Sequence, residues 1–348
     1  MKSKTFITAL ILVSGLFLSQ NLSSQEIKSF RAVQEFEIEG QSIRALYPIC
    51  SQEVYYASDQ GRVAHSKDAG ATWSKVDLDS TALRSIAMDK KKLFVLSIAN
   101  PARLIAFNKK LKKQELRYTQ EHTSVFYDAM MMDSSGFGLA IGDPTQGVMS
   151  VITTNDHGEN WNLVTPASLT PAVDGEAAFA ASNSNVKIID AQTAYFVSGG
   201  MVSRFYQTHD QGKTWETSEL PLLNGKPTTG AYTMDFYDAS RGIVFGGDYT
   251  DKGLSKDNIA LTSDAGKTWS VVPQGDSPGY RSCVQYVPGG GGEEILAVGT
   301  PGLSYSNDGG KTWQTDSRFQ NYYTLRFVDE NTLWMAGHEK MALVKINR

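Results

Sequence analysis

The amino-acid sequence predicts an all-β fold, a seven-bladed β-propeller, on two observations. One short turn motif recurs five times along the chain, and strand-like runs of apolar residues precede each copy. The composition agrees, because 31 Gly, 15 Phe, 15 Tyr and 6 Trp among 348 residues favour strands joined by glycine turns. With 41% hydrophobic and 20% charged residues, the composition is that of a folded chain and excludes wholesale disorder.

The chain opens with the pattern of a secretory signal peptide. Lys2 and Lys4 precede an apolar run over residues 6–18, and small polar residues follow. The run is too short to span a bilayer comfortably. We therefore expect residues 1–24 to be removed, Gln25 to begin the mature chain, and residues 25–348 to form one secreted or periplasmic domain without a transmembrane segment.

The recurrent motif has the consensus S/T-x-D-x-G-x-T/N-W. Its Asp carboxylate can accept hydrogen bonds from the backbone N–H groups that follow, and its Gly can adopt a positive φ at no steric cost. The Trp can cover apolar surface behind the turn. We therefore expect each copy to hold a turn between two antiparallel strands in a purely structural role. The five aspartates are Asp68, Asp156, Asp210, Asp264 and Asp308.

The spacing of the motifs gives the number of blades. Successive aspartates lie 88, 54, 54 and 44 residues apart, and the first gap is twice the last, which implies one unit without its motif. Seven units of strands follow, although six or eight blades stay open as alternatives. They begin near Ile43, Leu83, Val125, Ala177, Tyr232, Arg281 and Tyr323. The last unit has only three strands, so residues 30–38 are expected to supply its fourth strand and close the ring.

A propeller gathers polar residues at one mouth of its central channel. The innermost strands begin there and the loops between second and third strands return there, whereas the motif turns lie on the opposite face. Arginine forks suit carboxylate, sulfate or phosphate, and tyrosine rings suit sugars. The ligand-binding candidates are Arg44, Arg84, Arg281, Tyr232, Tyr249, Tyr280 and Tyr323.

Four carboxylates are expected at the same mouth. Glycoside hydrolysis generally needs two carboxyl groups flanking the scissile bond, so these residues are the catalytic candidates. The alternative is that arginines and carboxylates pair with each other and fill the channel. The candidates are Asp128, Asp143, Glu176 and Asp248.

The motif resembles the Asp-box, or BNR repeat, of sialidase-like propellers, in which the box is structural. The sialidase Arg-Ile-Pro signature is absent from the sequence. Blades such as GIVFGGDYTDKGLSKDNIALTSDAGKTW and ILAVGTPGLSYSNDGGKTW resemble more closely the photosystem II stability/assembly factor family. That resemblance implies a non-catalytic binding or assembly scaffold for a protein partner. A glycan-active enzyme or a glycan-binding protein that uses the same mouth is the alternative.

Other classes of function are not favoured. A balance of 33 basic against 37 acidic residues argues against nucleic-acid binding. Scattered histidines and two cysteines predict no metal site, and no dinucleotide-binding motif is present, so no cofactor is expected. We expect a monomer. Cys50 and Cys283 fall in units one and six, and whether they pair stays open.

The second unit carries seven lysines in two loops on the motif face. Such a patch could bind an acidic partner or an anionic lipid surface, or it could simply be two solvated hairpins. These residues are Lys90, Lys91, Lys92, Lys109, Lys110, Lys112 and Lys113.

Overall fold

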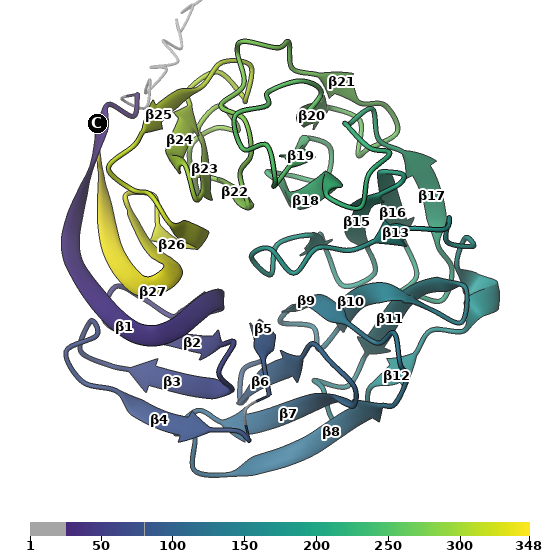
Figure 1. Cartoon of the computed structure of the whole chain (residues 1–348). Helices are drawn as coiled ribbons and strands as arrows, with labels where there is room; N and C mark the ends of the chain where they lie inside the picture. Colours follow the sequence, from purple (N-terminus) through teal and green to yellow (C-terminus); the bar gives the residue numbers. More distant parts are fainter. Residues whose placement is uncertain (1–25, 80) are drawn as a thin grey trace, which may run out of the picture.

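The computed structural model describes residues 26–79 and 81–348, and within them the strands form a ring of antiparallel sheets around a central channel (Figure 1). The predicted all-β propeller fold is therefore confirmed. The predicted signal peptide lies outside the described residues. In this part of the chain no helix is long and apolar enough to cross a membrane.

Three sheets have four strands each, paired in chain order. The first consists of β5 (Leu83–Met88), β6 (Lys92–Ser97), β7 (Ala102–Asn108) and β8 (Gln114–Gln120). The second consists of β9 (Tyr127–Met132), β10 (Gly138–Thr145), β11 (Val148–Thr154) and β12 (Asn162–Leu163). The third consists of β22 (Cys283–Tyr286), β23 (Ile295–Gly299), β24 (Gly302–Ser306) and β25 (Gln314–Asp316).

A nine-stranded sheet follows the short 3-10 helix η1 (Pro166–Ser168). A single residue pair, Gly199 with Gly230, joins β15 to β18 within it. Its first strands are β13 (Glu176–Ala177), β14 (Val186–Ile188), β15 (Ala194–Gly200), β16 (Arg204–Thr208) and β17 (Glu216–Glu219). Its remaining strands are β18 (Thr229–Phe236), β19 (Gly242–Asp248), β20 (Ile259–Thr262) and β21 (Ser270–Val271).

The remaining sheet joins the first and last strands of the described chain. It has the order β26-β27-β1-β2-β3-β4. The 20-residue strand β1 pairs with β27 through its first half and with β2 through its second half. The strands are β1 (Ser29–Pro48), β2 (Val54–Ser58), β3 (Arg62–Ser66), β4 (Ser74–Asp77), β26 (Tyr322–Asp329) and β27 (Thr332–Asn347).

The five motifs form the turns that the sequence predicted. At Asp210, one carboxylate oxygen accepts hydrogen bonds from Thr214 N (2.9 Å) and Thr208 Oγ1 (2.8 Å), and the other accepts one from Thr214 Oγ1 (2.7 Å). Thr208 Oγ1 in turn accepts a hydrogen bond from Gly212 N at 2.9 Å. The same arrangement recurs in the other four boxes.

The glycine of the box also makes a close contact between sheets. A Cβ atom built on Gly266, where φ is +82°, would lie 2.5 Å from the ring of Phe205 in β16. A Cβ on Gly158 would lie 2.4 Å from Phe94 of the neighbouring sheet. The absent side chain therefore lets the turns at Gly70, Gly158 and Gly266 sit directly on an aromatic ring, in addition to permitting the backbone conformation, whereas Gly212 lies against Thr153 and Gly310 against Leu261.

Substituting Gly266 tests this contact against Gly275, a matched control. Gly275 has φ +102° but no atom within 4 Å of a built Cβ, so Gly275→Ala should cost only the left-handed backbone strain of about 1–2 kcal/mol. We expect Gly266→Ala to lower the free energy of unfolding by about 1–3 kcal/mol more, because Phe205 must move. Urea unfolding curves of the two variants measure the difference, and equal losses would show that the inter-sheet contact contributes nothing.

Candidate functional site

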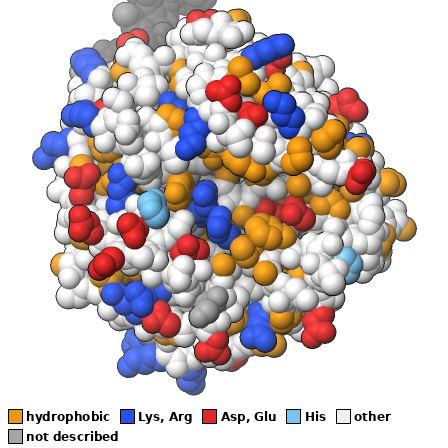
Figure 2. All heavy atoms as spheres, in the orientation of Figure 1, with side chains coloured by type: hydrophobic (Ala, Val, Ile, Leu, Met, Phe, Trp, Pro, Cys, Tyr) orange, Lys and Arg blue, Asp and Glu red, His pale blue; other side chains and the backbone are white. Residues whose placement is uncertain are grey.

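A cavity of about 430 Å³ lies where the innermost strands begin, at the mouth predicted from the sequence. Because these strands all start at one end of the channel, side chains from distant parts of the sequence meet there. A space-filling view in the orientation of Figure 1 shows a hollow at the centre of the ring, bordered by basic and hydrophobic side chains (Figure 2). Seven of the predicted residues line the cavity: Arg44, Arg84, Asp128, Tyr232, Tyr249, Tyr280 and Tyr323.

Residues 178–184, named the plug here, cross the channel, and residues 178–181 form the floor of this cavity. They connect β13 to β14, and the loop after β13 reaches into the middle of the ring (Figure 1). The Ser182 hydroxyl donates to Ser282 O, and the Met234 N–H donates to Ser184 O at 2.9 Å. Asn183 accepts a hydrogen bond from Met130 N at 2.8 Å. The plug was not predicted: the sequence analysis placed the start of a strand unit near Ala177, whereas residues 178–185 form no strand.

Two arginines bind the plug from the mouth side. Arg44 donates from Nη1 to Ala181 O at 2.7 Å, and Arg84 donates from Nη1 to Ala180 O at 3.3 Å. The Arg44 guanidinium also lies 4.0 Å from the centroid of the Tyr323 ring. Burial, and then the nearby charge of Arg44, lower the pKa of Arg84 to about 10. The Nε atoms of both arginines are buried without a hydrogen-bond partner among the described residues, so each retains an unused donor.

Aromatic rings form another wall of the mouth cavity. Tyr232 packs against Phe179 of the plug with ring centroids 4.6 Å apart, and against Tyr280 at 5.1 Å. The Tyr232 hydroxyl donates to backbone carbonyl oxygens, including Gly247 O at 3.0 Å. Tyr249 lies 6.3 Å from Tyr232 and is 42% exposed, so its ring is available at the rim. The wall therefore offers apolar faces to a ligand.

Asp128 is the carboxyl group on the cavity wall. It is fully buried, and neither of its oxygens accepts a well-formed hydrogen bond in the described part of the chain, although the Ala180 N–H and the charge of Arg84 lie close enough to act against the rise in its pKa. Burial raises the pKa of Asp128 well above its usual range, and the nearby Asp143 raises it further. Burial also raises the pKa of Asp143 to about 6, although its carboxylate accepts a hydrogen bond from Ala178 N at 2.9 Å. The pair therefore favours a bound proton near neutral pH.

The structure does not place Glu176 on the cavity, contrary to the sequence expectation. Its carboxylate accepts hydrogen bonds from Ser198 (2.6 Å) and Tyr206 (2.7 Å) and pairs with Arg204 at 3.2 Å. The two-residue strand β13 turns this side chain towards β15 and β16. Its carboxylate also accepts a hydrogen bond from Val173 N at 3.0 Å, so its sheet and the loop before β13 satisfy it together.

Arg281 and Asp248 also lie outside the cavity lining. Arg281 is 1% exposed and donates to Ser304 Oγ at 2.7 Å and to Tyr280 O at 2.7 Å, so it points into its own sheet. Asp248 accepts hydrogen bonds from the hydroxyl and N–H of Thr250 and holds the turn after β19. Asp143 does not line the cavity either, because its carboxylate is turned to the backbone N–H of Ala178. The predicted set of four carboxylates at the mouth thus reduces to one on the cavity wall.

The predicted lysine patch is only partly free. Lys92 forms an ion pair with Glu159, which also pairs with Arg117 at 2.9 Å. The other six lysines of the patch are exposed. Lys110 and Lys112 border a surface hollow together with Lys67, which the sequence analysis did not include.

The described residues contain neither a disulfide nor a group of side chains suited to a metal ion. Cys50 is exposed, Cys283 is buried, and both are free. Within residues 26–79 and 81–348, no three His, Cys, Asp or Glu side chains are grouped so that they could hold a metal ion.

Comparisons with known proteins find one Asp-box repeat and the propeller fold. The BNR/Asp-box repeat family model matches residues 304–315, which contain the last box. No curated protein matches the chain in sequence. A YCF48 structure bound to a D1 peptide has a TM-score of 0.65 at 15% identity, over 93% of this chain and 99% of that one.

Two further structures show the range of proteins that share the fold. YCF48 from Cyanidioschyzon merolae gives a TM-score of 0.63 at 12% identity, over 92% of this chain and 99% of that chain. The GH74 xyloglucanase from Xanthomonas campestris gives 0.62 at 15% identity, over 89% of this chain but 52% of that one. The chain thus resembles the photosystem II assembly-factor group in repeat and fold, and at these identities the likeness establishes the fold alone.

Replacing Asp128 with Asn tests the protonation of the buried carboxyl. A pKa raised by folding means that the folded chain holds the proton while the unfolded chain has released it, so stability falls as the pH rises above the ordinary value of 3.8. We expect Asp128→Asn to match the wild type at pH 3.5 and to exceed it in Tm by about 2–4 °C at pH 8.

Asp248→Asn is the control with the opposite sign. Although burial acts to raise the pKa of Asp248, the hydrogen bonds from Thr250 hold it below its usual value. That variant should be less stable than the wild type at pH 8. Thermal scans from pH 3.5 to 8 measure both variants, and an Asp128→Asn difference that does not grow with pH would contradict the assignment.

Proposed function

We propose that this chain is a non-catalytic binding scaffold that holds a peptide segment of a partner protein in the mouth cavity. The observation that carries the proposal is a set of buried polar groups, without partners among the described residues, around one cavity. They are the Nε atoms of Arg44 and Arg84, the carboxyl oxygens of Asp128 and the Thr300 hydroxyl. Buried polar groups in folded proteins are normally hydrogen-bonded, so a ligand that satisfies these groups would bind favourably.

The chemistry of the cavity suits a peptide. The arginine Nε–H groups can donate to a peptide carbonyl or carboxylate, and a protonated Asp128 can donate as well. Tyr232, Tyr249 and Phe179 offer apolar faces to a side chain. The similarity to a YCF48 structure bound to a D1 peptide supports this use of the fold, although it does not identify the partner of this chain.

Glycan hydrolysis is less well supported by the geometry. A hydrolase needs two carboxyl groups on either side of the scissile bond, and of the four candidates only Asp128 lies on the cavity wall. The fixed floor made by the plug also closes the channel that a polysaccharide would otherwise thread.

We infer further that the sheets make up seven blades, the last of which is closed by the N-terminal strand. Three sheets are single blades, and the nine-stranded sheet divides at its single residue pair between β15 and β18. The six-stranded sheet divides within β1, where the register shifts between Glu37 and Ser42. Residues 25–348 would then be one domain, in which the first half of β1 is the outer strand of the last blade.

The exposed lysines on the box face give the proposed scaffold a second contact. Lys110 and Lys112, with Lys67 beside them, present positive charge around a surface hollow. We propose that they contribute to holding an acidic part of the partner, as an electrostatic contact that weakens with salt.

We propose that the mature chain acts outside the cytoplasm after its signal peptide is removed. The basic start, the apolar run and the small residues around Ser24 are the features that support this. Mass spectrometry of the protein from its native cells should give a chain beginning at Gln25, recovered from the envelope or the medium. A chain that retains residues 1–24 in the cytoplasm would contradict this.

Peptide selection tests the binding function. Peptides selected from a displayed random library on the mature chain should bind with an affinity that Arg84→Gln lowers about tenfold or more, since each hydrogen bond to a charged group contributes about 1.5–3 kcal/mol. Lys267→Gln, in an exposed Asp-box turn on the opposite face and outside both proposed contacts, is the control and should bind normally. Selected peptides indifferent to Arg84→Gln would contradict the site, and glycan cleavage abolished by Asp128→Asn would establish the enzyme instead.

A further inference from the structure

A second cavity of about 410 Å³ lies at the other end of the channel, named the box-face cavity here. The ends of the innermost strands line it, on the face where the Asp-box turns lie. Asn183 and Ser184 of the plug line it from above, whereas residues 178–181 line the mouth cavity. The plug therefore separates two pockets, and no part of the proposed peptide site belongs to this one.

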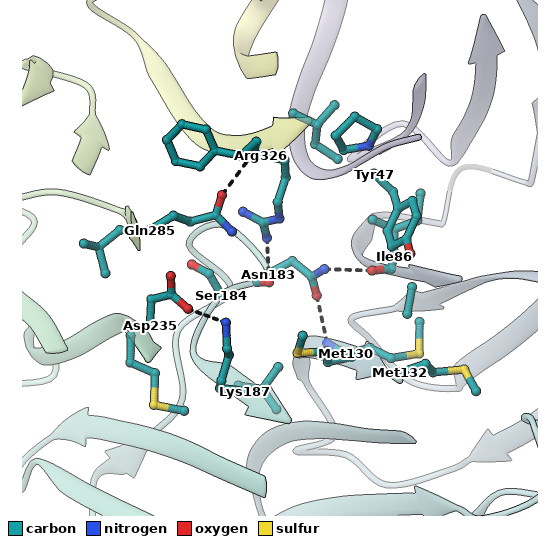
Figure 3. A pocket seen from close by; sticks show the side chains of 18 of the residues that line it. Tyr47, Ile86, Met130, Met132, Asn183, Ser184, Lys187, Asp235, Gln285 and Arg326 are labelled. Atoms are coloured by element: carbon teal, nitrogen blue, oxygen red, sulfur yellow. Dashed lines mark hydrogen bonds and ion pairs between the residues drawn. The ribbon is translucent and has the colours of Figure 1, made fainter. Parts of the chain in front are cut away.

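The box-face cavity has one apolar wall and one polar wall. Tyr47, Ile86, Met130 and Met132 lie along one side in the close view (Figure 3). Flexible methionine side chains can adapt to ligands of different shape. The volume falls within the range of about 300–1,000 Å³ found for small-molecule sites, which are mostly apolar with a few polar groups.

The polar wall carries more positive than negative charge. Lys187, Asp235, Gln285 and Arg326 line it (Figure 3). Arg326 hydrogen-bonds to the plug: its Nη2 donates to Ser182 O at 2.9 Å and to Asn183 O at 2.7 Å. Two cations against one carboxylate give this lining a net charge of +1.

Lys187 can bind an anion without leaving Asp235 unsatisfied. The Asp235 carboxylate accepts backbone hydrogen bonds from Phe236 N (2.9 Å) and Tyr286 N (2.8 Å), in addition to the Lys187 ammonium at 2.5 Å. An ammonium has three N–H donors, and Lys187 uses one of them here. The side-chain amide of Gln285 lies on the same wall; its oxygen accepts from Phe327 N at 3.4 Å, and its nitrogen donates to no acceptor among residues 26–79 and 81–348.

We propose that the box-face cavity is a second ligand site, which takes a small amphipathic anion with its apolar body against the methionine wall and its anionic head on Lys187 and Gln285. The site is independent of the peptide site at the mouth, from which the plug separates it. A medium-chain carboxylate or an aromatic sulfonate has the required chemistry. Charge complementarity decides against a neutral or cationic occupant.

The fluorescent probe 8-anilinonaphthalene-1-sulfonate tests the proposal on the full mature chain. It should bind saturably at one site, and dodecanoate should displace it. Lys187→Gln should weaken its binding about tenfold or more, because the variant removes a charge-assisted hydrogen bond while Asp235 keeps its two backbone donors. N-phenyl-1-naphthylamine, which lacks the sulfonate, should bind more weakly and should not respond to the substitution.

A second variant and a control keep the test decisive if Lys187→Gln folds poorly. Gln285→Glu retains an acceptor for Phe327 N and adds a negative charge to the same wall, so it should also weaken binding of the sulfonate. Arg84→Gln, in the mouth cavity, should leave it unchanged. Absence of saturable binding, or binding that depends on Arg84 and not on Lys187 or Gln285, would overturn the proposal.

Discussion

The hydrogen bonds that hold the plug across the channel determine what the rest of the structure can offer. A ring of sheets would otherwise enclose an open axial channel. Here the carbonyl oxygens of residues 180–184 accept hydrogen bonds from side chains or backbone of surrounding inner strands, from Arg44 on one side to Arg326 on the other. Because so many strands hold it, the segment is fixed in place, and both cavities have a rigid floor.

The buried charges around this floor differ in how they are compensated. Glu176 and Arg281 are hydrogen-bonded by their own sheets and the adjoining loops, so their burial is structurally explained. Asp128 is compensated only in part, by the charge of Arg84 and the backbone N–H of Ala180, and burial still favours its neutral form. If position 128 only had to fill the channel, an apolar residue would serve. The incompletely compensated carboxyl of Asp128 is therefore a stronger indication of a ligand than the well-paired carboxylate of Glu176.

Most of the residues that line the mouth cavity could be predicted from the sequence, because their place follows from the topology of a propeller. Strand starts converge at one end of a propeller, so Arg44, Arg84 and Tyr232 could be brought together from their positions alone. Arg281 and Glu176 do not line the cavity, although their strands start at the same end. The start of a strand determines which end of the sheet a residue occupies, but not which way its side chain points. The contact of Gly266 with Phe205 was missed for a related reason, since the motif describes one turn and the contact joins two sheets.

The plug gives this ring a mechanical property that an open channel would not have. The mouth cavity and the box-face cavity lie on opposite sides of the plug, which is a single segment of backbone. Nothing can travel along the axis from one face to the other, so the ring cannot act as a conduit. Because the plug is held in place, a ligand in either cavity cannot gain volume by displacing it. Each ligand must therefore fit the cavity as the plug shapes it.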